Sequence, residues 1–449
     1  MAMSDDISRE MDLASFEVVD TMTPGLWEDE PDARRSKVKL KDRLMSAWNS
    51  VRYRGWPRKG TPRLSKRRPV CLLGRFYQLD CSGERESFRR AFSSLLWMTY
   101  RRNFPPLEVL GPRSDAGWGC MLRSAQMLLA ETLLRHMMPS GTAALRSMLR
   151  LISCQLRPGL SVAPAGWTWP AAHRQTRDDL AVAGRPLWRS GKPRRFSLGD
   201  ALDGVNPEER THRRIVGWFG DLPSAPFSLH RLVELGRESG RRAGDWYGPG
   251  IAAHLLQKAV SASAVCDLQV CASVYTADVL ELCGAGDGAL RWRSLLLLVP
   301  VRLGTDALNA AYIPCVQRLL ELRCCVGIIG GKPKHSLYFV GFQKDQLIYL
   351  DPHFCQNTVD IKQHNFPLET FHCQNVRKMA FRRMDPSCTL GFYARSRADF
   401  LSLCSDVSQA LSSSEGKYPV FTFVEGHKPK ESDGCTSEQS SSTDEFVLL

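Results

Sequence analysis

The 449-residue sequence lacks several patterns that define common classes of protein. It has no run of about 20 apolar residues, the length that a membrane-spanning helix needs. Its longest apolar run, Leu295 to Val301, contains a proline and predicts a buried strand instead. The amino terminus is acidic and has no basic segment followed by an apolar one, so we expect no secretory signal. We therefore expect a cytoplasmic protein.

The cysteines lack the spacing of metal ligands. The chain has 15 cysteines, and no two of them form a C-x-x-C pair, so neither a zinc site nor a thioredoxin-type motif is indicated. We expect no metal and no cofactor. In the cytoplasm thiols stay reduced, and most of these cysteines should act as small buried apolar residues. A cysteine with a different role should therefore be recognisable by its surroundings.

The net charge of +13 has two interpretations. Basic residues are concentrated between positions 34 and 68 and between positions 150 and 242. They follow no known nucleic-acid-binding motif and do not alternate with aromatic residues, so a nucleic-acid partner is not expected. The excess predicts either a solvated basic surface or attraction to an anionic phospholipid surface.

Composition divides the chain into a globular part and two polar ends. Residues 1–65 predict a flexible extension in which Lys41 to Val51 has the apolar spacing of an amphipathic helix. Residues 66–426 predict the folded domain. Within it, residues 155–210 are rich in Pro, Gly, Arg and Ser, and predict an inserted loop or small subdomain. Residues 427–449 predict a flexible, Ser-rich tail.

The order of the expected elements favours an α+β fold, with helices first and strands later. A helix is also expected near the carboxyl end, over Ser396 to Leu411. The expected strands are Leu295 to Val301, Ser336 to Phe342, Leu347 to Asp351, Lys378 to Phe381, Leu390 to Ala394 and Tyr418 to Val424.

Cys120 is the candidate nucleophile. Good helix formers follow it for more than ten residues, and two glycines with a potential capping pair, Ser114 and Asp115, precede it. Cys120 should therefore lie in the first turn of a core helix. Unpaired backbone N–H groups and the helix dipole lower a thiol pKa at that position and favour the reactive thiolate. A purely structural cysteine at a helix start is the alternative interpretation.

Asp351 and His353 supply the matching acid and base. They end the apolar segment Leu347 to Leu350 and are separated by Pro352. Residues two apart on a strand point to the same side, so both groups can face one cleft, in direct contact or across a short gap. The carboxylate would then fix the imidazole tautomer and stabilise its charged form. His335 is interpreted as a hydrogen-bonded turn residue, with a position in the cleft as the alternative.

Six further segments of the chain stand out together. They are Leu96–Pro105, Asp115–Ser124, Gly244–Pro249, Gly327–Pro333, Tyr349–His353 and Met384–Ser387. In this order they resemble the autophagin family, the autophagy cysteine peptidases of the papain-like superfamily. The resemblance spans roughly residues 70–425 and is nearest to the vertebrate C and D types, with the D type favoured. Ala116 and Ser124 depart from the cysteines found in some members.

The resemblance implies a papain-like fold, in which the nucleophile-bearing helix packs on a mainly antiparallel sheet. It implies a monomeric peptidase that cleaves ubiquitin-like autophagy modifiers of the GABARAP and light-chain-3 kind after a glycine. It also implies hydrolysis of the conjugates of these modifiers with phosphatidylethanolamine, and therefore transient contact with membranes. The implied catalytic residues are Cys120, Asp351 and His353, and the implied site residues around them are Tyr100 for the oxyanion, Trp246 as a cover, and Gly330, Gly331 and Pro333 as a gating loop.

Two short segments outside the six resemble the motif that docks on the same modifiers. Phe446 and Leu449 end the acidic tail with an aromatic and an aliphatic residue three positions apart, and Phe16 and Val19 form a weaker candidate. Such a segment would add a strand to the edge of the modifier's sheet.

Two other functions remain open at this point. The first alternative is a binding adaptor with a weak or autoinhibited site. The second is an acyl transferase of the transglutaminase type. We also predict that residues 1–65 partly block the cleft, so that their removal raises the activity.

Overall fold

The computed structural model describes residues 64–108, 111–138, 207–263, 265–284, 292–363, 365–412 and 419–429. The expected extension over residues 1–65, its helix and the tail motif lie almost wholly outside these ranges, as does most of the expected insertion. The described helices are α2 (Ser82–Ser94), α3 (Cys120–Met137), α5 (Pro207–Trp218), α6 (Leu229–Gly236), α7 (Pro249–Ser263), α8 (Thr276–Cys283), α9 (Ile313–Glu321) and α10 (Arg397–Leu411).

The strands within the described ranges form a nine-stranded mixed sheet and a separate two-stranded pair. The central strand order of the large sheet is β10-β8-β7-β6-β11-β5-β4. Strand β1 also pairs with β7, and β2 pairs with β1. All pairings in the large sheet are antiparallel except that of β4 with β5. The strands are β1 (Val70–Leu72), β2 (Arg75–Tyr77), β3 (Arg101–Arg102), β4 (Leu268–Cys271), β5 (Ser294–Arg302), β6 (Cys325–Lys332), β7 (His335–Gln343), β8 (Gln346–Leu350), β9 (Gln356–Asn357), β10 (Arg377–Ala380) and β11 (Ser387–Ala394).

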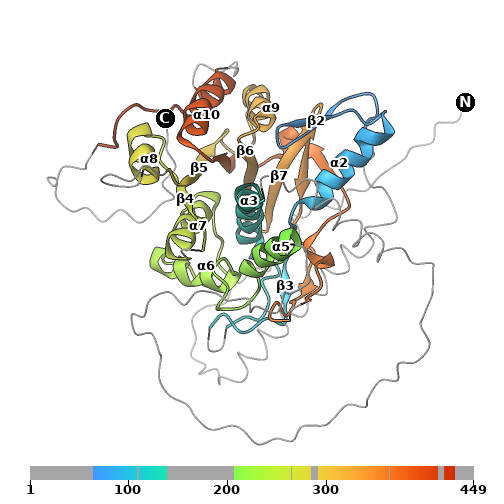
Figure 1. The fold of residues 1–449 in the computed structure, drawn as a ribbon, viewed down its shortest axis with the longest axis vertical. Coiled ribbons are helices and arrows are strands. Elements are labelled where there is room, and N and C mark those ends of the chain that lie inside the picture. The colour runs from blue at the N-terminus through green and yellow to red at the C-terminus, as the bar shows by residue number, and fades with distance from the viewer. Residues whose placement is uncertain are drawn as a thin grey trace, which may run out of the picture.

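Two apolar cores lie on opposite faces of this sheet. Alternate residues of β5 show this, because Leu296 and Leu298 belong to one core whereas Leu295 and Leu297 belong to the other. Helices α3, α5, α6 and α7 cover the first face, and α9 and α10 cover the second (Figure 1). Successive side chains of β5 enter opposite cores, which explains why this strand is almost wholly apolar.

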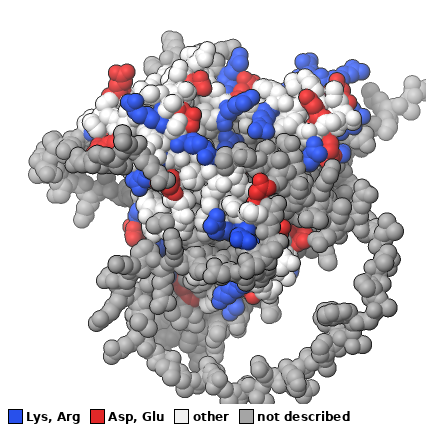
Figure 2. Space-filling view, viewed as in Figure 1, with Lys and Arg blue, Asp and Glu red and all other residues white. Residues whose placement is uncertain are grey.

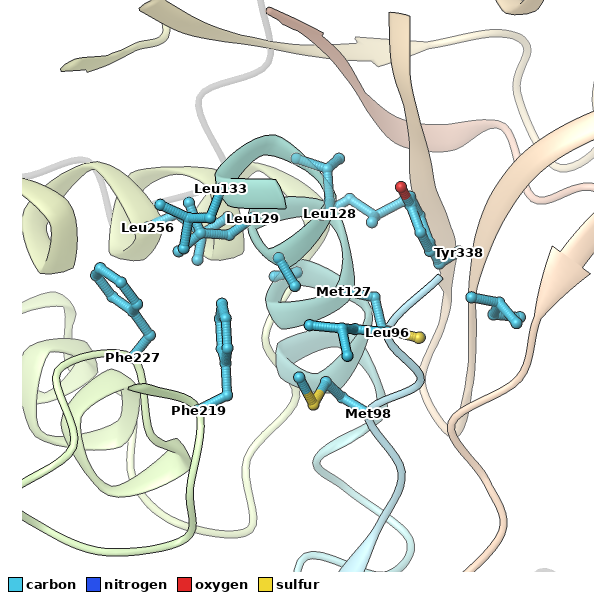
Figure 3. Packing of buried hydrophobic residues seen from close by; sticks show 14 of the residues in the cluster. Leu96, Met98, Met127, Leu128, Leu129, Leu133, Phe219, Phe227, Leu256 and Tyr338 are labelled. Atoms are coloured by element: carbon cyan, nitrogen blue, oxygen red, sulfur yellow. The ribbon is translucent and has the colours of Figure 1, made fainter. Parts of the chain in front are cut away.

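Helix α3 is the central element of the first core. All but four of its 18 residues are buried. It packs against β6 and β7 on one side and α7 and α5 on the other. Figure 3 shows its apolar side chains between Tyr338 of β7 and the aromatic pair Phe219 and Phe227. The expected core helix is thus confirmed, and its amino end is fixed rigidly against the sheet.

The expected strands are confirmed except for the last. Five of them match β5, β7, β8, β10 and β11 to within three residues at each end, and the expected helix matches α10. The strand expected over Tyr418 to Val424 is wrong. There Val424 makes an isolated bridge with Tyr275, and Phe421 is buried in the second core. The apolar residues of this segment therefore anchor it by packing rather than by a ladder of hydrogen bonds.

Candidate active site

Cys120 lies at the amino end of α3 and is fully buried. Gly119 caps the helix and makes no side-chain hydrogen bond, so the expected capping pair is wrong. Asp115 instead accepts hydrogen bonds from the backbone of Arg101 and the side chain of Arg123. A Cβ atom at Gly119 would lie 2.5 Å from the Asp115 carboxylate, which explains why glycine precedes the nucleophile position. The amino end of α3 is thus positioned by the close packing of Gly119 against Asp115 and not by a capping side chain.

Asp351 and His353 contact each other directly. Strand β8 ends at Leu350, so the pair lies in the following turn and not on the strand itself. The Asp351 Oδ1 atom accepts hydrogen bonds from His353 Nδ1 at 2.6 Å and from the His353 backbone N–H at 3.0 Å. The turn brings the two side chains together more closely than the side-by-side positions of a strand would. Both residues are buried.

Two further residues fix Asp351, and sequence analysis missed both of them. Arg377 Nη1 donates to Asp351 Oδ2 at 2.9 Å, and Trp97 Nε1 donates to the Asp351 carbonyl at 2.7 Å. Arg377 reaches the carboxylate because β10 pairs with β8, which places Arg377 opposite Tyr349. This pairing brings together residues 26 positions apart, and no local pattern in the sequence marks it.

The environment favours a charged Cys120–His353 pair. Burial raises the pKa of the Cys120 thiol, but the hydrogen bond and charge of His353 outweigh it, aided by the Ser336 backbone and Tyr100, so the pKa falls below 9.0. Burial lowers the pKa of His353, but the charge and hydrogen bond of Asp351 raise it to about 10. The pair therefore holds a thiolate and an imidazolium, the form in which a cysteine is nucleophilic.

Tyr100 and Trp246 lie against the cysteine. Tyr100, Ala116, Cys120 and Cys355 form a small buried cluster, and Trp246 packs on it from the segment before α7. The Tyr100 ring meets the His353 ring edge to face at 5.4 Å. The backbone of Tyr100 is bonded to the Pro352 carbonyl, which keeps this tyrosine beside the turn. The two aromatic residues named from the sequence are thus part of the same site.

The segment expected to be a gating loop is a β-hairpin. Gly330 and Gly331 belong to β6, and only Pro333 and Lys334 form the turn to β7. Gly331 has φ +146°, and a Cβ atom there would lie 2.1 Å from the His335 carbonyl oxygen, so the hairpin needs glycine. The expectation of a loop over the glycines is wrong, because their close backbone contacts extend the ladder. The hairpin nevertheless ends at the site, where the His335 ring lies 6.1 Å from that of His353. His335 is therefore the first residue of β7 rather than a turn residue, and it lies beside His353, which agrees with the less favoured alternative.

A buried ion network lies behind the nucleophile. Arg123 of α3 pairs with Asp115 at 2.7 Å and with Asp221 at 2.8 Å, and all three side chains are nearly inaccessible. Gln126 accepts a hydrogen bond from Arg123 and donates one to the Phe227 carbonyl. This network, also missed in the sequence, joins the segment before Cys120 to the one after α5.

Several predicted features lie elsewhere. The docking residues Phe446, Leu449, Phe16 and Val19 are outside the described residues. Among the residues that the structure covers, no group of three or more His, Cys, Asp or Glu side chains is placed to hold a metal ion. In the same part of the chain, no helix is both long and apolar enough to cross a membrane. On the face drawn in Figure 2, lysine and arginine side chains are interspersed with acidic ones and form no single patch.

The fold and the site together define a class of protein. A buried thiol at a helix amino end, opposite an imidazole held by a carboxylate, is the arrangement of a cysteine hydrolase. With the central helix packed against a mainly antiparallel sheet, the structure is that of a papain-like cysteine peptidase.

Comparison with known proteins identifies the family. The model of the peptidase C54 catalytic domain matches residues 85–406. A zebrafish (Danio rerio) relative named cysteine protease atg4da is 46% identical, and the match covers 92% of this chain and 90% of the relative. Mouse (Mus musculus) cysteine protease ATG4C is 39% identical, with 92% and 98% covered. Xenopus laevis cysteine protease ATG4D is 41% identical, with 89% and 84% covered. The chain belongs to the peptidase C54 family and is a cysteine peptidase, which confirms the resemblance to vertebrate C- and D-type autophagins.

Proposed function

We propose that this peptidase cleaves ubiquitin-like autophagy modifiers of the GABARAP and light-chain-3 kind after their C-terminal glycine. We propose further that it hydrolyses the amide between that glycine and phosphatidylethanolamine. The observation that supports the proposal best is the contact of His353 with Asp351 beside the Cys120 thiolate. The names of the relatives agree with it, because they are cysteine proteases of the ATG4 series.

In the first step Cys120 is the nucleophile. Its Sγ atom attacks the glycine carbonyl carbon, the C–N bond breaks, and His353 donates its proton to the departing amine. The product is a thioester between Cys120 and the modifier. Asp351, held by Arg377, keeps the His353 imidazole oriented and stabilises its charge throughout.

In the second step water replaces the amine. Neutral His353 removes a proton from water, the oxygen attacks the thioester carbonyl, and Cys120 leaves as a thiolate. Each step passes through an oxyanion that needs donors. The Cys120 backbone N–H, at a helix amino end, and the Tyr100 hydroxyl are suited to this role. The end products are a modifier with a free terminal glycine and the released amine.

Trp246, which covers the site, and the β6–β7 hairpin explain a preference for glycine as the last residue before the cleaved bond. Trp246 packs on the cluster that contains Cys120, so the chain entering the site must be narrow. A side chain on the last residue would collide with this cover, whereas glycine has none. Gly330, Gly331 and Pro333 border the entrance as part of a hairpin, and we propose that its turn moves aside when the modifier's tail enters.

Partner contacts outside the site complete the proposal. Phe446 with Leu449, and more weakly Phe16 with Val19, would bind the modifier and raise its effective concentration at the cleft. Contact with membranes would be peripheral and transient, and the enzyme would act as a cytoplasmic monomer.

The direct test uses the full chain and a GABARAP-type precursor. Mass spectrometry should find cleavage after the glycine, and liposomes that carry the conjugate should release the modifier. Both activities should be lost in Cys120→Ser. If Cys120→Ser processed the precursor as fast as the unmodified protein, the proposed nucleophile would be wrong. Binding through Phe446 without turnover, both in the full chain and after removal of residues 1–65, would instead show an adaptor.

A further inference from the structure

The tip of the β6–β7 hairpin carries cations beside the active site. Lys332, Lys334 and His335 are exposed, and only Pro333 separates the first two. Lys332 lies directly opposite His335 across the hairpin. Directly opposed residues of an antiparallel pair have Cβ atoms about 5 Å apart on the same face of the sheet. Lys332 therefore points to the side on which His335 meets His353.

These two lysines have no acidic partner among the described residues. Asp351, the carboxylate at the site, binds other residues, because one oxygen accepts from His353 and the other from Arg377. Lys332 and Lys334 thus add positive charge at the exposed border of the catalytic histidine without a structural ion pair of their own. Exposed cations without an ion pair in the described part of the chain are suited to an anionic ligand.

The position of His353 fixes which part of a substrate passes this hairpin. His353 protonates the departing amine, so the leaving group extends from the histidine. In a phosphatidylethanolamine conjugate the phosphorus is four bonds from that nitrogen, or roughly 5 Å when extended. The His335 ring is 6.1 Å from the His353 ring. A phosphodiester on the leaving amine therefore comes within reach of the hairpin tip.

The geometry points to a phosphodiester subsite on the hairpin tip, formed by Lys332 and Lys334 beside His335. This inference rests on the proposed function and names the leaving group that the site recognises. The subsite binds the phosphate of the lipid headgroup while Cys120 attacks the glycine carbonyl. A peptide leaving group has no phosphate at this distance, so the subsite favours deconjugation over precursor processing. The covalent steps are those already described, and the leaving group is the primary amine of the ethanolamine headgroup, whose oxygen carries the phosphodiester.

The experiment uses two soluble substrates that need no membrane. In one, the modifier's glycine forms an amide with glycerophosphoethanolamine, and in the other it forms an amide with ethanolamine. They differ by the phosphate and its glycerol, and inorganic-phosphate-free buffer avoids competition. The quantity measured is the ratio of kcat/KM for the two substrates. The peptide precursor is assayed alongside them.

The variant is Lys332→Gln with Lys334→Asn, compared with the matched control Lys344→Asn. Lys334 and Lys344 both have positive φ, at 65° and 56°, in turns at opposite ends of β7. Asparagine tolerates this conformation, so both substitutions keep the turn. His335 is left unchanged because its ring contacts His353.

We expect the unmodified protein and Lys344→Asn to favour the phosphodiester substrate by about tenfold, as charge-assisted hydrogen bonds to phosphate predict. The double variant should bring the ratio to within about twofold of one. A ratio near one in the unmodified protein, or an unchanged ratio in the variant, would overturn the subsite. Loss of activity by the variant only on liposomes would overturn it too, because the lysines would then bind the membrane surface. If neither amide nor the precursor were cleaved, the proposed function itself would fail.

Discussion

The reactivity of Cys120 depends on a balance between burial and its neighbours. Burial raises the pKa of other described thiols, for example that of Cys325 to about 11. At Cys120 the same effect is reversed by His353, Ser336 and Tyr100. The helix-start position could be predicted from the sequence because strong helix formers follow a glycine. The contribution of the Ser336 backbone could not, since it depends on how β7 packs on α3.

Selective alkylation should reveal this balance. The ordinary pKa of a cysteine thiol is 9.0, and the pKa of Cys120 is lowered in the folded protein. Iodoacetamide should therefore modify Cys120 at pH values below 9.0, because its thiolate already forms there. The charged pair should be lost again as the pH rises through about 10, where His353 deprotonates. In His353→Ala the alkylation midpoint should move upward. Peptide mass spectrometry measures the rate at each cysteine, and an unchanged midpoint in the variant would contradict the account.

Arg377 is predicted to act through Asp351. Arg377→Gln removes the cation from Asp351 Oδ2, so the carboxylate can rotate away from His353. We expect kcat to fall by about tenfold with little change in KM, as for loss of a charge-assisted hydrogen bond. Arg377→Lys should restore part of kcat. Equal kcat in Arg377→Gln and the unmodified protein would show that Trp97 and the turn alone hold Asp351.

Individual elements are held in place by contacts between distant parts of the sequence. The Arg123 network ties α3 to Asp115 and to Asp221, almost a hundred positions further on. Sequence patterns predicted α3 itself, because its apolar residues have helical spacing. They could not predict its buried arginine, which has the same helix propensity whether it is buried or exposed. They also failed at Gly330 and Gly331, where glycines indicate a turn but are needed for close strand pairing.

Breaking this network should destabilise the fold strongly. Arg123→Met removes the cation that is paired directly with the two buried carboxylates, which costs about 3–5 kcal/mol. Urea unfolding measures the loss in the free energy of unfolding. The control is Arg231→Met, which breaks an exposed pair with Glu234 and should cost less than about 1 kcal/mol. Similar losses in both variants would contradict a special role of the buried network.

At the scale of the whole molecule, two stacked histidines make stability depend on pH. The rings of His212 and His372 are buried and lie 5.3 Å apart, joining α5 to the segment after β9. Burial lowers the pKa of His372 to about 4 and that of His212 well below 6.5. The folded protein therefore keeps both rings neutral, whereas the unfolded chain protonates them near 6.5.

Stability should fall as the pH drops below that value. Because the unfolded state binds more protons there, each histidine lowers the free energy of unfolding by up to about 1.4 kcal/mol per pH unit. His212→Leu should therefore show a shallower loss between about pH 7 and about pH 5 in urea unfolding. Lys344→Asn, on an exposed turn, serves as the control. The same slope in all three proteins would exclude the histidine pair as the cause.

The overall architecture was predictable only in part, because β1, β2, β4 and β6 were not among the expected strands. Strands such as β5 and β11 are long and apolar, and α10 has a clear capping residue in Ser396, so local patterns sufficed. The last expected strand failed because Phe421 is used for packing, which the pattern of apolar residues does not distinguish from a ladder. The strand order, which brings Arg377 to Asp351, depends on contacts across the chain and has no local signal.

Covalent capture tests the central claim most directly. A modifier ending in glycine with a vinyl sulfone in place of the scissile amide should react with the full chain. We predict one adduct, on Cys120, with none in Cys120→Ala and a much slower reaction in His353→Ala, because the imidazole keeps the thiol ionised. An adduct on a different cysteine, or equal rates in His353→Ala and the unmodified protein, would contradict the assignment of Cys120 and His353 as the reacting pair.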